Sequence, residues 1–134
     1  MTGTNGANGS AGINGTEGGR RIGAAFEAAR REGRAALVPY VVAGYPDLET
    51  SYAAALACID AGADVLEVGL PYSDPLADGA TLQRASSVAL KAGATFDRSI
   101  ELVGRIAESR PRVPLVPQSY ANQLIVGCDG REAA

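Results

Sequence analysis

The chain has 134 residues, of which 46% are hydrophobic and 20% are charged, and its net charge is −3. This is enough for one small globular domain. The acidic balance, without a basic stripe, argues against nucleic acid and anionic membrane surfaces as partners. No apolar run reaches the roughly 18–20 residues of a membrane span, and no secretion signal opens the chain, so we expect a cytoplasmic protein.

Residue counts also limit the chemistry. The chain has no histidine, which excludes Ser-His and Cys-His catalysis and most zinc sites, so we expect no metal. A disulfide framework is not expected from Cys58 and Cys128, because Cys58 lies among apolar neighbours and resembles a buried small hydrophobe. Lys91 is the only lysine, so it is the one candidate for a Schiff-base mechanism. It lies on the surface of a predicted helix.

Two segments differ in composition. Residues 1–19 are rich in Gly, Asn and Thr, and we expect them to form a disordered tail. Residues 20–134 read as one folded domain, in which helical periodicity over 20–32 is ended by Gly33. After that helix we expect a strand at 35–43, strongest at 40–43, and a helix at 51–61 after an Asp47 cap. A strand at 65–70 and a loop at 71–80 follow. Helices at 81–92 and 96–109, the latter capped by Thr95, precede a last strand at 113–120.

Alternating strands and helices are typical of parallel β/α units, and near-continuous apolar strands suit a sheet that is covered on both faces. The two candidate folds are an open doubly wound sheet and a (β/α)8 (TIM) barrel. No G-x-G-x-x-G motif follows the first strand, which weakens the dinucleotide-binding alternative. We therefore predict an α/β chain of the TIM-barrel class, covering about its first three β/α units.

Glu67 is the most informative residue of the second predicted strand. Alternation places Leu66, Val68 and Leu70 on the face that packs on helices, and Glu67 with Gly69 on the face that looks into a barrel. Burial disfavours the charged form of an acid, so such a carboxylate is suited to moving protons near neutral pH. The alternative is a structural glutamate paired with an arginine.

A second acid, Asp78, lies in the following loop, where barrel enzymes carry their active groups. Loop aspartates also cap helices or stabilise turns, so a structural role for Asp78 stays open as the alternative. Two acids in unlike environments can act as separate acid and base. Tyr40 and Tyr120, on the first and third strands, suit either a core or the wall of a ligand site.

The segment Leu66-Glu67-Val68-Gly69-Leu70-Pro71-Tyr72-Ser73-Asp74-Pro75-Leu76-Ala77-Asp78-Gly79 closely resembles the signature of the tryptophan synthase alpha chain. Residues 38–41, 44–46, 61–64, 81–83, 92–93 and 120–122 extend the resemblance, which covers roughly 20–129. It implies a TIM-barrel lyase of tryptophan biosynthesis that cleaves indole-3-glycerol phosphate to indole and glyceraldehyde 3-phosphate by a retro-aldol step. By resemblance, Glu67 is the catalytic proton shuttle, Asp78 is the catalytic acid that stabilises the indole N–H, and Tyr40 and Tyr120 bind the substrate.

The resemblance also implies a partner. The loop residues Tyr72, Ser73, Asp74, Pro75 and Leu76 would face a tryptophan synthase beta chain in an alpha2-beta2 tetramer. No cofactor is implied for this chain, because pyridoxal phosphate belongs to the beta chain.

The chain also departs from the family pattern. A full barrel needs about 250 residues and usually binds phosphate after strands seven and eight. The alternative is therefore a truncated, catalytically silent fragment or a beta-chain-binding module that lacks the phosphate-binding half. Gln118 stands where an apolar pocket residue is more usual. An aldolase-type barrel would need a catalytic lysine in a strand, and none is present.

Overall fold

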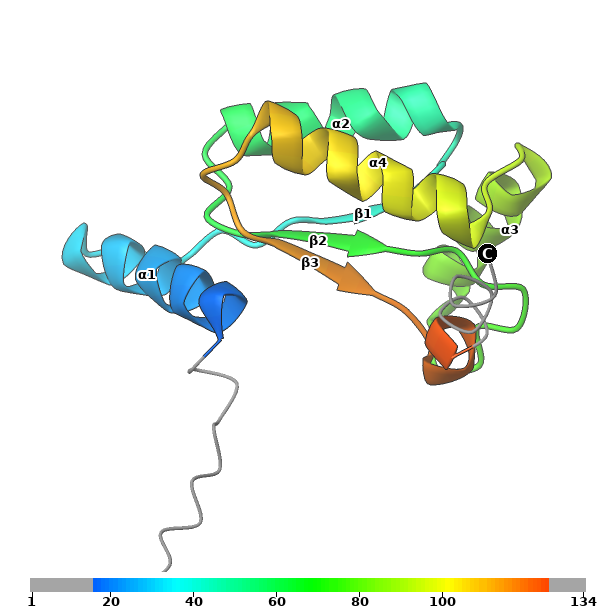
Figure 1. Ribbon diagram of the computed structural model, residues 1–134, viewed down its shortest axis with the longest axis horizontal. Helices are drawn as coiled ribbons and strands as arrows, with labels where there is room; N and C mark the ends of the chain where they lie inside the picture. Colours follow the sequence, from blue (N-terminus) through cyan, green and yellow to red (C-terminus); the bar gives the residue numbers. More distant parts are fainter. Residues whose placement is uncertain (1–15, 126–134) are drawn as a thin grey trace, which may run out of the picture.

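The computed structural model describes residues 16–125. They form a parallel three-stranded sheet in the order β1-β2-β3, with four helices around it (Figure 1). The elements in chain order are α1 (Glu17–Arg31), β1 (Tyr40–Val42), α2 (Leu48–Asp60), β2 (Leu66–Gly69), α3 (Ala80–Lys91), α4 (Phe96–Ser109) and β3 (Leu115–Gln118). Residues 121–125 form a further helical turn.

The core lies between one face of the sheet and the helices α2 and α4, which run along that face (Figure 1). Leu66 and Val68 of β2 are fully buried there. They pack in one cluster with Ala55 and Ile59 of α2 and with Leu102 and Ile106 of α4. The alternation predicted for β2 is therefore confirmed, because Glu67 must point to the opposite face of the sheet. We call that opposite side the inner face.

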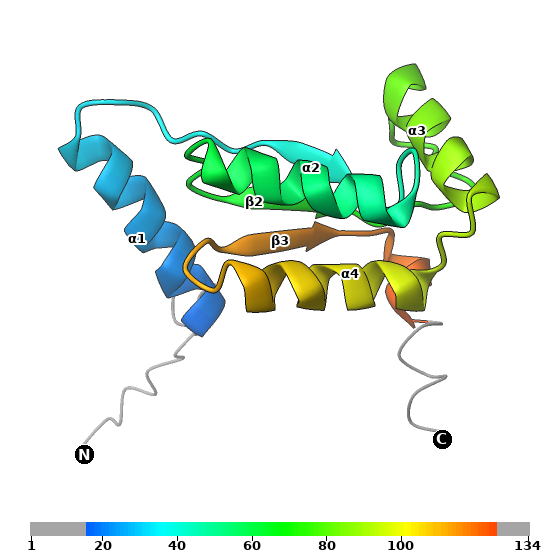
Figure 2. The ribbon, with the colours of Figure 1, turned by 90° about the horizontal axis from the view of Figure 1, so that it is seen from above.

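The helices α1 and α3 lie at opposite ends of the sheet (Figure 2). α1 begins at Glu17 rather than at the expected residue 20, because the Thr16 side chain accepts the Gly19 N–H and caps the helix. The predicted tail 1–19 is thus wrong for residues 16–19, and its remainder lies outside the described residues. Gly33 adopts a φ of 71° just after α1, as expected for a helix stop.

The predicted caps of α2 and α4 are confirmed. Asp47 accepts the Thr50 N–H at 2.7 Å, and α2 consequently starts at Leu48, three residues before the expected start. Thr95 accepts the Arg98 N–H at 3.3 Å, and α4 spans the expected residues.

All three strands are shorter than expected, and a proline explains the late start of β1. β1 is limited to Tyr40–Val42, since Pro39 has no N–H for the ladder, although its carbonyl still accepts the Glu67 N–H at 2.9 Å. β3 is limited to Leu115–Gln118 and includes Pro117. Proline is tolerated there because β3 is an edge strand among the described residues.

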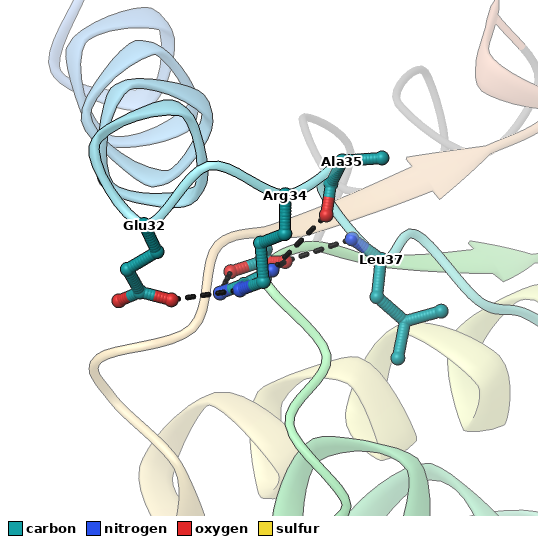
Figure 3. A network of polar contacts seen from close by, with 5 residues as sticks. Glu32, Arg34, Ala35 and Leu37 are labelled. Carbon is teal, nitrogen blue, oxygen red and sulfur yellow. Dashed lines mark hydrogen bonds and ion pairs between the residues drawn. The ribbon is translucent and has the colours of Figure 1, made fainter.

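A polar network ties the segment after α1 to the start of β2 (Figure 3). Arg34 donates two hydrogen bonds to the Asp64 carboxylate, at 2.6 and 2.8 Å, and one to Glu32 at 2.7 Å. Asp64 also accepts the Leu37 N–H at 2.7 Å. The pKa of Asp64 is lowered to about 2, mainly by its hydrogen bonds to the Arg34 guanidinium and secondly by its bond from the Leu37 N–H.

Cys58 is a free thiol that packs against the core as expected but is half-buried, and so less buried than predicted. Cys128 lies outside the described residues. Among residues 16–125, no helix is both long and apolar enough to cross a membrane.

Candidate functional site

A cavity of about 220 Å³ lies where the strands end and the loop after β2 begins. Its lining residues come from β1, from β3 and from the segments that follow β2 and β3: Tyr40, Leu70, Ala77, Asp78, Gln118, Ser119 and Tyr120. Active groups of parallel β/α proteins are found at this end of the strands. The structure thus brings together three of the four residues predicted for catalysis and substrate binding.

Tyr40 crosses from β1 over β2. A methyl group at Gly69 would stand 1.9 Å from the Tyr40 hydroxyl oxygen, so the phenol lies directly over this glycine. Burial raises the pKa of Tyr40, and the charges of Asp78 and Glu67 raise it further. The Tyr40 hydroxyl therefore lies within electrostatic reach of both predicted acids.

Glu67, the fourth predicted residue, is not among the residues that line the cavity. It is paired in register with Tyr40 on β1 and with Val116 on β3, on the inner face, and it is half-buried. Within residues 16–125 its carboxylate makes no ion pair or hydrogen bond. The alternative of an arginine-paired structural glutamate therefore finds no partner among these residues.

The loop that carries Asp78 is fixed by two side chains from other elements. Gln83 of α3 donates to the Asp78 carbonyl at 2.9 Å and to the Pro75 carbonyl at 3.4 Å. Tyr120 accepts the Ala77 N–H on its hydroxyl oxygen at 3.0 Å. These bonds hold the backbone on both sides of Asp78 at the mouth of the cavity.

The start of the same loop is held by the segment after β3. Gln123 donates to the Pro71 carbonyl at 2.9 Å, and Asn122 donates to the Tyr72 hydroxyl. The rings of Tyr72 and Tyr120 lie 5.0 Å apart, a distance typical of favourable aromatic pairs. The loop is therefore attached to the core of the chain at both ends.

The five residues predicted to contact a beta chain differ in exposure. Ser73, Asp74 and Leu76 are exposed, and Leu76, at 82%, is more exposed than any other large hydrophobic residue within 16–125. Tyr72 and Pro75 are half-buried. The tip of the loop thus presents an apolar side chain on a fixed backbone.

Sequence reasoning did not assign roles to Gln83, Gln123 or Ser119. The bonds of the two glutamines reach loop carbonyls whose position depends on the fold, and an isolated glutamine gives no signal in a sequence. Among the described residues, Ser119 bonds only to its neighbours Tyr120 and Gln123. Across residues 16–125, no three His, Cys, Asp or Glu side chains gather as a metal site would require.

The fold and the site define a protein of the (β/α)8-barrel class, with its functional groups at the carboxyl ends of parallel strands. Residues 26–131 match the family described as "Tryptophan synthase alpha chain". The chain therefore belongs to the tryptophan synthase alpha chain family.

Individual relatives agree with this membership. The tryptophan synthase alpha chain of Roseiflexus castenholzii is 45% identical over 105 residues, covering 78% of this chain and 40% of the relative. A solved chain from Aquifex aeolicus superposes with a TM-score of 0.74 at 40% identity, over 78% of this chain and 42% of that one. A chain of aminoacrylate-bound tryptophan synthase from M. tuberculosis superposes with a TM-score of 0.73 at 38% identity, over 78% of this chain and 42% of that one. The chain spans about 40% of the length of its curated relatives and matches the N-terminal part of their barrel.

Proposed function

We propose that this chain provides the indole-binding part of a carbon–carbon lyase that cleaves indole-3-glycerol phosphate to indole and glyceraldehyde 3-phosphate. One observation carries the proposal: Asp78 lies with Tyr40 and Tyr120 around one cavity, and Glu67 lies next to Tyr40 without a neutralising partner among the described residues. Two aromatic walls suit a flat ring, and two free carboxylates suit proton transfer and charge stabilisation on that ring.

The proposed reaction uses both acids. Protonated Glu67 gives its proton to C3 of the indole ring, and the positive charge that develops on the ring nitrogen is stabilised by the Asp78 carboxylate through the N–H. Glu67, now a carboxylate, takes the proton of the side-chain hydroxyl. As the hydroxyl carbon becomes the aldehyde, the carbon–carbon bond breaks and its electron pair returns to the ring. Glyceraldehyde 3-phosphate and indole leave, and no metal or redox cofactor takes part.

The phosphate of the substrate needs groups beyond this chain. Barrels of this class bind phosphate after strands seven and eight, and this chain spans about 40% of its relatives. We therefore expect the 134-residue chain by itself to be catalytically silent. Activity should require the remaining strands.

Reconstitution tests this proposal. The 134-residue chain is mixed with the part of the Roseiflexus castenholzii relative that lies beyond the matched region, and indole release from indole-3-glycerol phosphate is measured. Glu67→Gln and Asp78→Asn should each lower turnover by at least about 100-fold, the usual contribution of a positioned acid or base. Glu101→Gln, an exposed acid on α4, is the matched control. Release by the mixture but not by the isolated chain supports the proposal, and near-normal turnover in either acid variant contradicts it.

A second candidate function is docking to a beta chain in an alpha2-beta2 assembly, with pyridoxal phosphate held by the partner. The fixed loop and its exposed Leu76 favour it. Fixing a loop before binding lowers the entropy cost of association. The proposal retains the sequence-based expectation that the assembly is cytoplasmic.

Calorimetric titration of this chain with a tryptophan synthase beta chain tests the docking role. Leu76→Ser should weaken binding about tenfold or more, since an apolar anchor is lost at the centre of the contact. Leu37→Ser replaces a leucine that is 50% exposed just before β1, at the other end of the sheet, and should leave affinity unchanged. Equal affinity of the Leu76→Ser variant and the parent chain would contradict the role of the loop.

A further inference from the structure

The floor of the cavity carries two polar groups around one glycine. Gly69 is paired in register with Gln118 on β3 and lies beneath the Tyr40 hydroxyl. Tyr40 and Gln118 both line the cavity. The phenol of Tyr40 and the carboxamide of Gln118 therefore lie beside Gly69, the residue of β2 whose side chain is only a hydrogen.

These two groups differ from the hydroxyls of Tyr120 and Ser119 at the same site in having no hydrogen-bond partner among residues 16–125. Within residues 16–125, neither the Tyr40 hydroxyl nor the Gln118 amide makes a hydrogen bond. By contrast, the Tyr120 hydroxyl accepts the Ala77 N–H, and the Ser119 hydroxyl donates to Gln123 at 2.7 Å. Tyr40 and Gln118 thus remain available to a ligand.

An apolar ring seated on this floor would remove water from both groups and give no hydrogen bond in return, which is unfavourable. The phenol can donate or accept, and the carboxamide has two donor hydrogens and an acceptor oxygen. The group that satisfies both at once is a hydroxyl, which also donates and accepts.

We propose that Tyr40 and Gln118 make this pocket selective for an indole ring that carries a hydroxyl group on its benzo ring. The inference rests on the proposed function, because it takes the indole ring as the ligand of the cavity. It goes further in stating which ring substituent the pocket selects and which two residues select it. A pocket that hydrogen-bonds a hydroxyl binds the ring that carries it more tightly than an analogue of equal shape that cannot form the bond.

Ligand pairs of equal shape separate this selectivity from simple filling of space. The 134-residue chain is titrated, by amide chemical shifts in NMR, with indole, with each benzo-ring hydroxyindole, and with the methylindole substituted at the same position. A methyl group fills nearly the same volume as a hydroxyl but cannot form hydrogen bonds. At least one hydroxyindole should bind roughly three- to tenfold more tightly than its methyl counterpart, the effect of one net hydrogen bond.

Two variants assign the selectivity to its residues. Gln118→Leu and Tyr40→Phe keep most of the side-chain volume and should each abolish or reverse the preference for the hydroxyl. Indole itself is titrated alongside, so that a general loss of binding is distinguished from a loss of the preference. Glu108→Gln, at an exposed position of α4, should keep the preference of the parent chain, and circular dichroism checks that each variant is folded.

The outcomes separate this inference from the function on which it rests. Indole binding with no preference for any hydroxyindole over its methyl counterpart overturns the selectivity alone. A preference that survives in both variants also overturns it, because other groups must then provide it. Absence of saturable shifts with all the ligands overturns both the selectivity and the proposed indole site.

Discussion

The hydroxyl oxygen of Tyr40 lies so close to the Cα of Gly69 that a side-chain carbon there would come within 1.9 Å of it. The two residues are on neighbouring parallel strands, and Tyr40 reaches the cavity only because Gly69 has no side chain. The glycine of the family signature therefore has a physical role in this chain. It lets a phenol from β1 lie across β2 and form part of the floor of the cavity.

Replacing Gly69 tests this close approach. Gly69→Ala should displace the Tyr40 ring and destabilise the chain by about 1–3 kcal/mol, the usual cost of overpacking. Urea unfolding measures the stability, and the NMR shifts of the Tyr40 ring report its position. Gly104→Ala is the control: the space around Gly104 on α4 is open, and a mid-helix alanine should gain up to ~1 kcal/mol. Unchanged Tyr40 shifts in the Gly69→Ala variant would contradict the account.

The loop that carries Asp78 should loosen when its supports are removed. Tyr120→Phe keeps the ring that packs on Tyr72 but removes the oxygen that accepts the Ala77 N–H. We expect the free energy of local opening of the loop to fall by about 0.5–1.5 kcal/mol, the contribution typical of one hydrogen bond. Amide hydrogen exchange at Ala77 should accelerate roughly 2- to 10-fold, an equivalent change. Exchange that matches the parent chain would show that the bond does not hold the loop.

Acid should destabilise the chain partly through Asp64. Its pKa of about 2 in the folded chain lies below its ordinary value of 3.8. The unfolded chain therefore takes up this proton at a higher pH than the folded chain does. The stability that Asp64 contributes is present above about pH 4 and is lost as the pH falls toward about 2.

Asp64→Asn isolates that contribution. The asparagine oxygen can still accept the Leu37 N–H, while the titrating charge beside Arg34 is gone. The midpoint of thermal unfolding should fall less between pH 4 and pH 2 in this variant than in the parent chain. Some fall should remain, because hydrogen bonds also lower the pKa values of Asp47, Glu49 and Asp60. Identical pH profiles for Asp64→Asn and the parent chain would exclude the Arg34–Asp64 pair as the cause.

Local signals in the sequence predicted most of the fold. The caps at Asp47 and Thr95 and the alternation around Glu67 depend on neighbouring residues, so they could be recognised without the structure. The prediction was less accurate at the ends of elements, where two local signals compete. Pro39 shortens β1, and the Thr16 cap extends α1 into a glycine-rich segment whose composition alone suggested disorder.

The sequence singled out two acids and two tyrosines, whose roles stay predictions, but it did not single out the residues that support the loop beside them. Glu67 and Asp78 could be singled out, because an acid in an apolar strand and an acid in a strand-end loop each suggest chemistry. The bonds of Gln83 and Gln123 to loop carbonyls could not, because they join α3 and the segment after β3 to a loop whose path depends on the whole sheet. The Arg34–Asp64 pair joins residues 30 positions apart and was missed for the same reason.

The most direct test of the central claim, that Glu67 and Asp78 act together on one substrate, is a double-mutant comparison in the reconstituted barrel. Indole release from indole-3-glycerol phosphate is measured for Glu67→Gln, for Asp78→Asn and for the variant with both changes. Groups that act as a unit are strongly non-additive. Each single change should lower turnover at least about 100-fold, and the double change should lower it little further. Near-normal turnover in either single variant, or losses that simply multiply in the double variant, would contradict the account.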